Sequence, residues 1–300
     1  ECRWGDSPRD PSGARLWARP AATAADAAGG AGDWRPCAVP GEPLGRAGHR
    51  YLWLRTRLTG PIISDPASRP ALFLLVVDHS LEAYLDGAQI YRFGVLDAGD
   101  DEGDARRFSG FKSHYIPIGD GYQGKTLALR IYSDHTNIGI TGQVYVGSQL
   151  ALTLACARRG QARFLIGAVL GALGLVVLAL FALQRREASY AYFGSFVLCA
   201  GVWEVAQAQS RTLFVDMPLL WVYLDFGAFY LMPPLVISYL IRLIGEGPMG
   251  LTLRLAQLFW LYLLVSLLLI VAGISSILSV WLPYVLLLMS SVIYMVGMTL

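Results

Sequence analysis

The residues best suited to bind a small molecule lie in the first half of the chain, where aromatic rings alternate with guanidinium groups. Trp53 and Arg55 share the outward side of one alternating stretch, and Arg130 and Tyr132 share the outward side of another. An aromatic ring beside a planar cation can stack on the face of a sugar. The same residues could instead be ordinary cross-strand pairs that hold a sheet together. The pattern therefore predicts either a carbohydrate-binding face or a structural ladder.

Histidine and aspartate side chains suggest a second kind of site, because imidazole and carboxylate are common metal ligands. The residues concerned are Asp78, His79, His114, Asp134 and His135. They lack the short spacing of a metal site, so we expect no metal and no cofactor, and we interpret the histidines as hydrogen-bonded loop residues. The acidic stretch 97–104 lacks the alternating oxygen ligands and terminal Glu of a calcium loop, and it is predicted to be a solvated loop.

Two carboxylates stand out among the apolar segments of the second half. At ~1.5 Å rise per residue, Glu204 and Asp225 each lie ~9–10 Å from a predicted helix end, at matching depth on antiparallel neighbours. Carboxylates in hydrocarbon are costly and usually mark function, so this pair is predicted to hold a proton or a cation, or to pair with Arg211. Alternatively, both reach interfacial water beside Trp and Tyr side chains. Pro233-Pro234 is predicted to form either a hinge or a static kink.

Strands must position the residues of the first half. Residues 1–32 form a Pro-, Gly- and Ala-rich entry segment. The expected strands are 51–58, 71–77, 81–93 (two strands that meet at Asp86-Gly87), 112–118, 126–133 and 142–148. Alternation turns Leu52, Leu54 and Leu58 inward in the first of these, and Leu127, Leu129 and Ile131 inward in the fifth. Short strands without intervening helices predict a β-sandwich over 33–150.

Two cysteines flank the entry segment. Cys2 and Cys37 could close a disulfide across the Ala/Gly stretch in an exported domain, provided that their Cα atoms come within ~7 Å. The spacing alone leaves this open.

Apolar helices follow from residue 160 onward. Phe164–Gln184 is uncharged and long enough to cross the hydrocarbon layer. Further spans are predicted at 189–209, 218–244, 255–273 and 280–300, which gives an all-α bundle of five spans over 160–300. Gly167, Gly171 and Gly174 would let a neighbouring helix approach closely.

Composition limits the partners. The 300 residues are 55% hydrophobic and 15% charged, with a net charge of +2, which argues for a bilayer and against nucleic acid as a partner. The chain begins without Met and stops inside a hydrophobic run at Leu300, so we expect both ends to continue.

Several motifs of the first half resemble a known module. They are Asp33-Trp34, Val39-Pro40-Gly41, Tyr51–Arg55, Glu82–Gly87, Ile116-Pro117 and Leu127–Ser133. Together, over about 33–148, they resemble the jelly-roll sugar-binding module of family-two glycosidases. The resemblance implies a galactose-binding-like sandwich. It does not imply glycoside hydrolysis, because no catalytic barrel accompanies the module.

The order of the two halves resembles a second family. A jelly-roll followed by several spans, with Asn137–Gly142 leading to Val146–Ser148, is similar to bacterial seven-transmembrane receptors with diverse intracellular signalling modules. The resemblance implies an extracytoplasmic sensor in the bacterial inner membrane and a cytoplasmic cyclase, kinase or phosphatase beyond Leu300. Arginines near the predicted spans are balanced on both sides, so the positive-inside rule does not decide the orientation.

We therefore expect a sensory receptor, which binds a small ligand, carbohydrate-like in class, and dimerises through its bundle or its output domain. The alternative is an integral-membrane transporter or enzyme with an accessory carbohydrate-binding domain. A surface adhesion module is the third hypothesis, although one span would suffice for it. The sequence contains no H-E-x-x-H, no G-x-S-x-G and no P-loop, so we predict no catalytic site in this chain.

Overall fold

The computed structural model describes residues 1–7, 15–18, 34–59, 69–77, 80–94, 96, 110–133, 137–184, 187–275 and 279–299. Contacts divide the chain into two compact units, Glu1–Ala157 and Arg158–Leu300, and each is described by itself. The predicted ligands Asp78, His79, Asp134 and His135, and the acidic stretch 97–104, lie outside the described residues.

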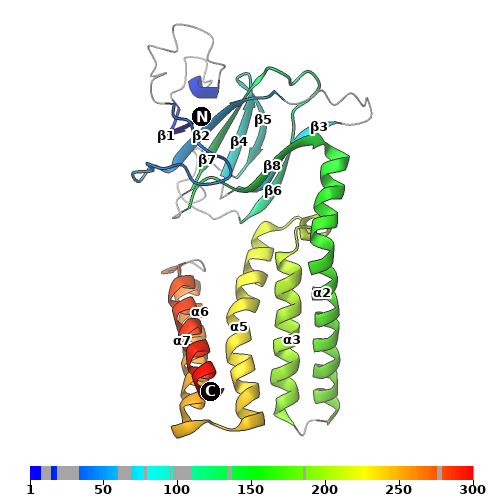
Figure 1. Ribbon diagram of the computed structural model, residues 1–300, viewed down its shortest axis with the longest axis vertical. Helices are drawn as coiled ribbons and strands as arrows, with labels where there is room; N and C mark the ends of the chain where they lie inside the picture. Colours follow the sequence, from blue (N-terminus) through cyan, green and yellow to red (C-terminus); the bar gives the residue numbers. More distant parts are fainter. Residues whose placement is uncertain are drawn as a thin grey trace. The chain divides into compact units, whose positions relative to one another are not determined.

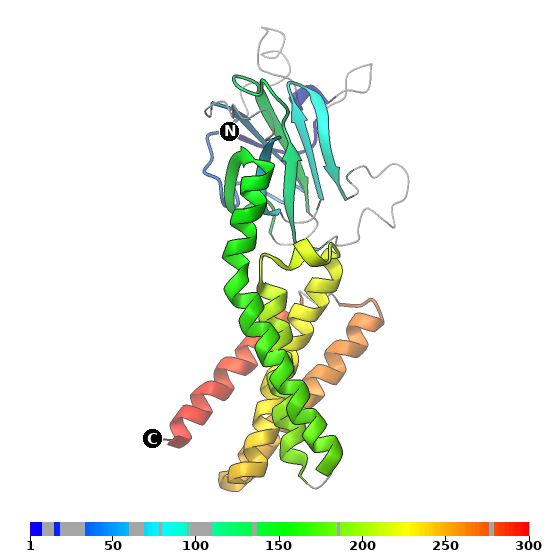
Figure 2. The same cartoon turned by 90° about the vertical axis from the view of Figure 1, so that its right-hand side faces the viewer.

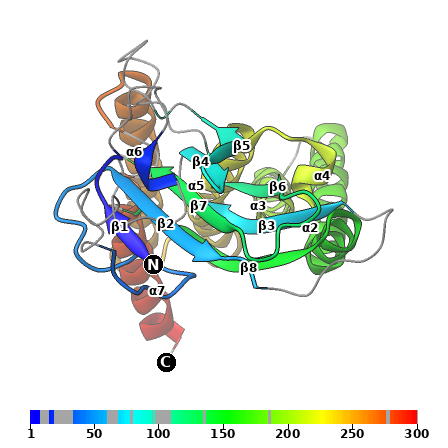
Figure 3. The same ribbon diagram turned by 90° about the horizontal axis from the view of Figure 1, so that it is seen from above.

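The first unit contains two antiparallel sheets (Figure 1). Its strands are β1 (Cys2–Trp4), β2 (Tyr51–Arg57), β3 (Pro70–Val77), β4 (Ser80–Leu85), β5 (Ala88–Phe93), β6 (Lys112–Pro117), β7 (Thr126–Tyr132) and β8 (Ile140–Ser148), and a 3-10 turn, η1, covers Leu16–Ala18. One sheet has the order β1-β2-β7-β4-β5 and the other the order β6-β3-β8, as Figure 3 shows.

Alternation along the strands builds the core. Buried leucines and isoleucines from both sheets join one apolar cluster, which includes the inward residues predicted for β2 and β7. In the hairpin between β4 and β5, Asp86 and Gly87 both have positive φ (49° and 89°), as the sequence predicts. Strand β1 was not predicted, because three residues are too few to show a period.

The second unit is helical. Its elements are α3 (Ala188–Gln207), α4 (Arg211–Phe214), α5 (Pro218–Ile244), the 3-10 turn η3 (Pro248–Gly250), α6 (Leu251–Val271) and α7 (Trp281–Thr299), with the greater part of α2 (Gln149–Gln184). Helix α2 starts at the residue after β8 and runs uninterrupted, in green in Figure 2. Within the described residues, α2, α5 and α6 are long and apolar enough to cross a membrane.

The prediction of five spans is supported for three of them. Helix α3 exists near its predicted position, but tyrosines, glycines and Glu204 lower its hydropathy, and it is not one of the three. The apolar part of α7 in the described residues, Trp281–Tyr294, is too short to count. Helix α2 also begins 15 residues before the predicted span at Phe164, because the preceding polar segment continues the same helix.

Glycines bring α2 and α3 into close contact, as the sequence predicts. A Cβ on Gly201 of α3 would lie 2.4 Å from the backbone nitrogen of Gly171 and 2.7 Å from the carbonyl oxygen of Gly167. A Cβ on Gly174 would lie 2.6 Å from the nitrogen of Leu198. Only glycine fits at such distances, so the two backbones pack directly against each other.

Candidate functional site

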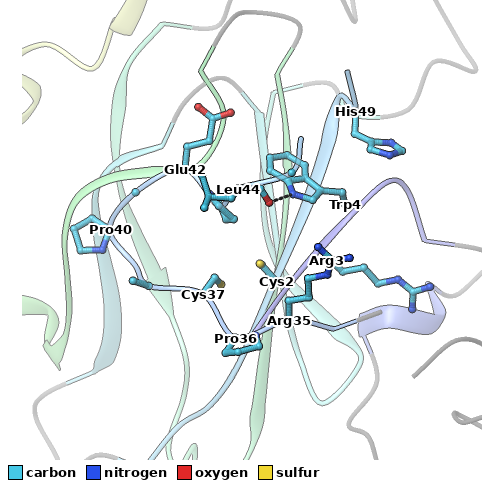
Figure 4. A pocket seen from close by; sticks show the side chains of 14 residues that line it. Cys2, Arg3, Trp4, Arg35, Pro36, Cys37, Pro40, Glu42, Leu44 and His49 are labelled. Carbon is cyan, nitrogen blue, oxygen red and sulfur yellow. Dashed lines mark hydrogen bonds between the residues drawn. The ribbon is translucent and has the colours of Figure 1, made fainter. Parts of the chain in front are cut away.

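A polar pocket in the first unit is the strongest candidate for a binding site. Its volume is about 640 Å³. Residues of β1 form part of its wall, the segment 35–45 forms the rest, and His49 stands at the rim (Figure 4). The backbones of Cys2 and Arg35 exchange two hydrogen bonds of 2.7 and 3.0 Å, which fix the segment beside β1.

The side chains of this pocket suit a small polar molecule. Arg35 contributes a guanidinium group, Glu42 a carboxylate, and Trp4 an indole whose Nε1 donates to the carbonyl oxygen of Leu44 at 3.1 Å (Figure 4). Guanidinium and carboxylate groups can bind hydroxyl or acidic groups of a ligand in a fixed orientation. An adjacent ring offers apolar contact to the ligand's faces.

The two predicted disulfide partners meet in the wall of the pocket. The thiols of Cys2 and Cys37 lie close to each other, and both are free thiols in this structure (Figure 4). Burial, together with the neighbouring Cys37, raises the pKa of the Cys2 thiol to about 11. The disulfide remains a prediction, and the structure brings its two ends together.

The predicted sugar-stacking face is not a surface. Trp53 and Arg130 are 0% exposed, Tyr132 is 5% exposed, and Arg55 is half-buried. Trp17 from the entry segment packs edge-on against Trp53, with ring centroids 6.0 Å apart. Trp53 lies on the opposite side of the sheet from the leucines, as predicted, but that side is covered, so the expectation of an accessible binding face is wrong. Alternation identifies the two faces of a strand, but it does not show that a distant segment covers the second face.

These residues pair across the sheet instead. Trp53 lies opposite Arg130 in the register of β2 and β7, as the alternative prediction of a structural ladder expects. The guanidinium of Arg55 donates to the carboxylate of Glu1 at 2.7 Å and lies 4.3 Å over the ring of Trp34.

A buried ionic network lies under the covering segment. Arg130 donates through Nε and Nη2 to both carboxylate oxygens of Asp6 (2.9 and 2.8 Å), and through Nη1 to Glu82 (3.0 Å). Tyr84 also donates to Glu82 (2.8 Å), and Arg15 donates to Asp6 (3.0 Å). Burial by itself lowers the pKa of Arg130, but Asp6 and Glu82 outweigh it and hold this pKa above its ordinary value. The network ties the entry segment to the sheet.

His114 has a structural environment. It is fully buried in β6, its Nδ1 lies 3.0 Å from the Tyr91 hydroxyl, and its ring meets Phe93 edge-on at 5.0 Å. It therefore lies on the strand predicted over 112–118, and the interpretation of this histidine as a loop residue is wrong. In the part of the chain that the structure describes, no three His, Cys, Asp or Glu residues are placed to hold a metal ion.

The second unit pairs Asp225 with an amide and not with Glu204. Gln207 Nε2 donates to both carboxylate oxygens of Asp225, at 2.9 and 3.1 Å. Arg211 of α4 lies near enough to Asp225 for an electrostatic interaction. Gln207 follows Glu204 by three residues, so the two side chains lie about one turn apart on nearly the same side of α3, and the alignment of α3 along α5 decides which of them meets Asp225. A proton or cation shared by Glu204 and Asp225 remains a prediction.

Sequence reasoning missed the pocket itself. Arg3, Trp4 and Arg35 carry no motif, and they come together only because two distant segments pair. The signal was present in Cys2 and Cys37, since a disulfide between them would also bring their neighbours together.

No protein-family model and no curated protein matches the chain. Solved structures of two β-glucuronidases are similar to part of it. That of Bacteroides uniformis is 15% identical over 49% of this chain and 17% of its own, with a TM-score of 0.31. That of Faecalibacterium prausnitzii is 17% identical over 45% of this chain and 20% of its own, with a TM-score of 0.30. The chain thus spans a fifth or less of these enzymes, and a likeness of this size carries neither their fold nor their activity over to it.

Proposed function

We propose that the chain is a membrane-bound sensor. In this proposal the two-sheet unit is a jelly-roll sandwich that binds a small polar ligand, carbohydrate-like in class, in the pocket beside β1. The helical unit passes the binding event across a bacterial inner membrane to an output domain, with the pocket on the extracytoplasmic side and with the chain as a dimer.

The join between strand and helix is the observation that carries this proposal. β8 ends at Ser148 and α2 begins at Gln149, so no linker residue separates a sheet strand from a membrane-length helix. The backbone nitrogen of Gln149 donates to the carbonyl oxygen of Arg69, just before β3, at 3.0 Å. A ligand that binds one arrangement of these strands more tightly would also shift the position of α2.

The pocket supports the first half of the proposal. It combines a guanidinium group, a carboxylate and an indole in about 640 Å³, a size typical of small-molecule sites. A passive anchor would need neither this pocket nor three membrane-length helices.

The test is ligand binding by the full chain in nanodiscs, with a glycan array of neutral and acidic sugars. We expect Arg35→Ala and Glu42→Gln to weaken binding by about tenfold to a hundredfold each, because each removes one charge-assisted contact worth about 1.5–3 kcal/mol. Arg92 is exposed and lies outside the pocket, so Arg92→Ala is the matched control and should bind normally. Equal binding by all variants would remove the pocket from the proposal. Uptake of the sugar into sealed vesicles would instead indicate transport.

A further inference from the structure

The two adjacent prolines of α5 open a gap in its backbone hydrogen bonding. Pro233 and Pro234 lie inside the helix, and neither has an amide hydrogen. In an α-helix each amide bonds to the carbonyl four residues before it, so the carbonyls of Phe229 and Tyr230 lose their usual donors. An unsatisfied carbonyl in hydrocarbon costs several kcal/mol, so another donor is expected nearby.

Tyr284 of α7 supplies a donor at one of these two carbonyls. Its hydroxyl donates to the carbonyl oxygen of Tyr230 at 2.7 Å. Its side chain is 0% exposed, and its ring meets the ring of Tyr230 at 4.6 Å in an edge-on contact. Phe229, Phe259 and Tyr262 surround the same ring at 5.6 to 5.8 Å. The hydroxyl is thus held at the carbonyl that Pro234 leaves open.

We propose that the Tyr284 hydroxyl replaces the missing amide of Pro234, and that this contact ties the bend of α5 to the position of α7. Any movement that separates the two helices must break the hydrogen bond from Tyr284 to the Tyr230 carbonyl. The contact is therefore a latch with two states, bonded and released. The bonding part of this proposal does not depend on the proposed function, whereas a role in signalling rests on it.

A double-mutant cycle on the full chain in detergent tests the latch. We expect Tyr284→Phe to raise the unfolding equilibrium constant by about threefold to tenfold, as for other hydrogen bonds between membrane helices. Pro234→Ala restores an amide that bonds to the same carbonyl. In that background Tyr284→Phe should change the constant by less than about twofold, since the carbonyl keeps a donor.

Pro233→Ala is the matched control, because it restores the amide for Phe229 and leaves Tyr230 open. In the Pro233→Ala background, Tyr284→Phe should raise the unfolding equilibrium constant by as much as it does in the native chain. Amide exchange in residues 235–241 gives a second readout, and it should quicken in Tyr284→Phe and return to normal when Pro234→Ala is added. An effect of Tyr284→Phe that is the same in all three backgrounds would overturn the latch. Ligand binding by Tyr284→Phe distinguishes this proposal from the proposed function. If the cycle gives the expected result while ligand binding is normal, the latch is tested separately from the pocket.

Discussion

Arg130 shows how one residue can join an irregular segment to a sheet. It makes charge-assisted bonds to Asp6 in the entry segment and to Glu82 in β4, while its guanidinium lies 4.6 Å over the ring of Tyr51. Removing one member of such a buried network leaves the others charged and without compensation. The residue is 0% exposed, and its contacts join the entry segment to the sheet.

We expect Arg130→Met to lower the free energy of unfolding of the first unit by about 3 kcal/mol or more, because Glu82 would remain buried without its closest cation. Denaturant unfolding followed by tryptophan fluorescence would measure the loss. Arg92→Ala is the control, since Arg92 is 48% exposed and lies 3.7 Å from Glu82, and such pairs contribute about 0–1 kcal/mol. Similar losses in both variants would contradict the assigned role of the network.

The thiol pair predicts a pH dependence. The pKa of Cys2 in the folded chain, about 11, exceeds its ordinary value of 9.0. As the pH rises above 9, the unfolded chain therefore loses its proton first, and the free energy of unfolding of the reduced protein should fall between about pH 9 and 11. Subtracting the profile of Cys2→Ala isolates this contribution from buried tyrosines, which titrate in the same direction.

Oxidised protein should lack this contribution, because a disulfide has no thiol to titrate, and mass spectrometry without reductant would report a Cys2–Cys37 bridge. Identical pH profiles for the reduced native chain and Cys2→Ala would rule out the raised pKa.

At the scale of elements, the contact between α2 and α3 depends on glycine. We expect Gly201→Ala to destabilise the helical unit by at least about 1–3 kcal/mol, because its Cβ would overlap backbone atoms of α2 at 2.4 Å and force the helices apart. Gly227→Ala is the control, since a Cβ there meets nothing within 4 Å and alanine favours a helix by about 1 kcal/mol. Thermal unfolding in detergent measures both variants. A Gly201→Ala chain as stable as Gly227→Ala would show that the helices do not pack as described.

At the scale of the molecule, one labelling experiment decides whether α3 crosses the membrane. Leu44, 94% exposed, and Glu246, also exposed, are separated along the chain by α2, α3 and α5. Three crossings put them on opposite sides of the bilayer, whereas two put them on the same side. We expect an impermeant maleimide to label Leu44→Cys in intact cells and to label Glu246→Cys only after lysis, compared with the native chain. Labelling of both in intact cells would mean that α3 does not cross.

Most of the architecture could be predicted from the sequence, because it depends on short-range periods. Neighbouring residues alone are enough to predict the alternation in β2 and β7 and the hairpin at Asp86-Gly87. Helices α5 and α6 could be predicted from long, mainly apolar runs alone. Strand β1 and the early start of α2 were missed, since one is too short to show a period and the other is too polar to look like a span.

The candidate site depended on pairings between distant segments, and the sequence does not contain them in a local form. The segment after Trp34 pairs with β1, which assembles the pocket, and the entry segment covers the ring of Trp53. Gln207, and not Glu204, meets Asp225 because of how α3 is aligned along α5. Likewise, Pro233-Pro234 predicts a break in α5, but only the packing of α7 brings the Tyr284 hydroxyl to the open carbonyl. Local periods determine which elements form, whereas the partner of each buried polar group is decided by how those elements pack.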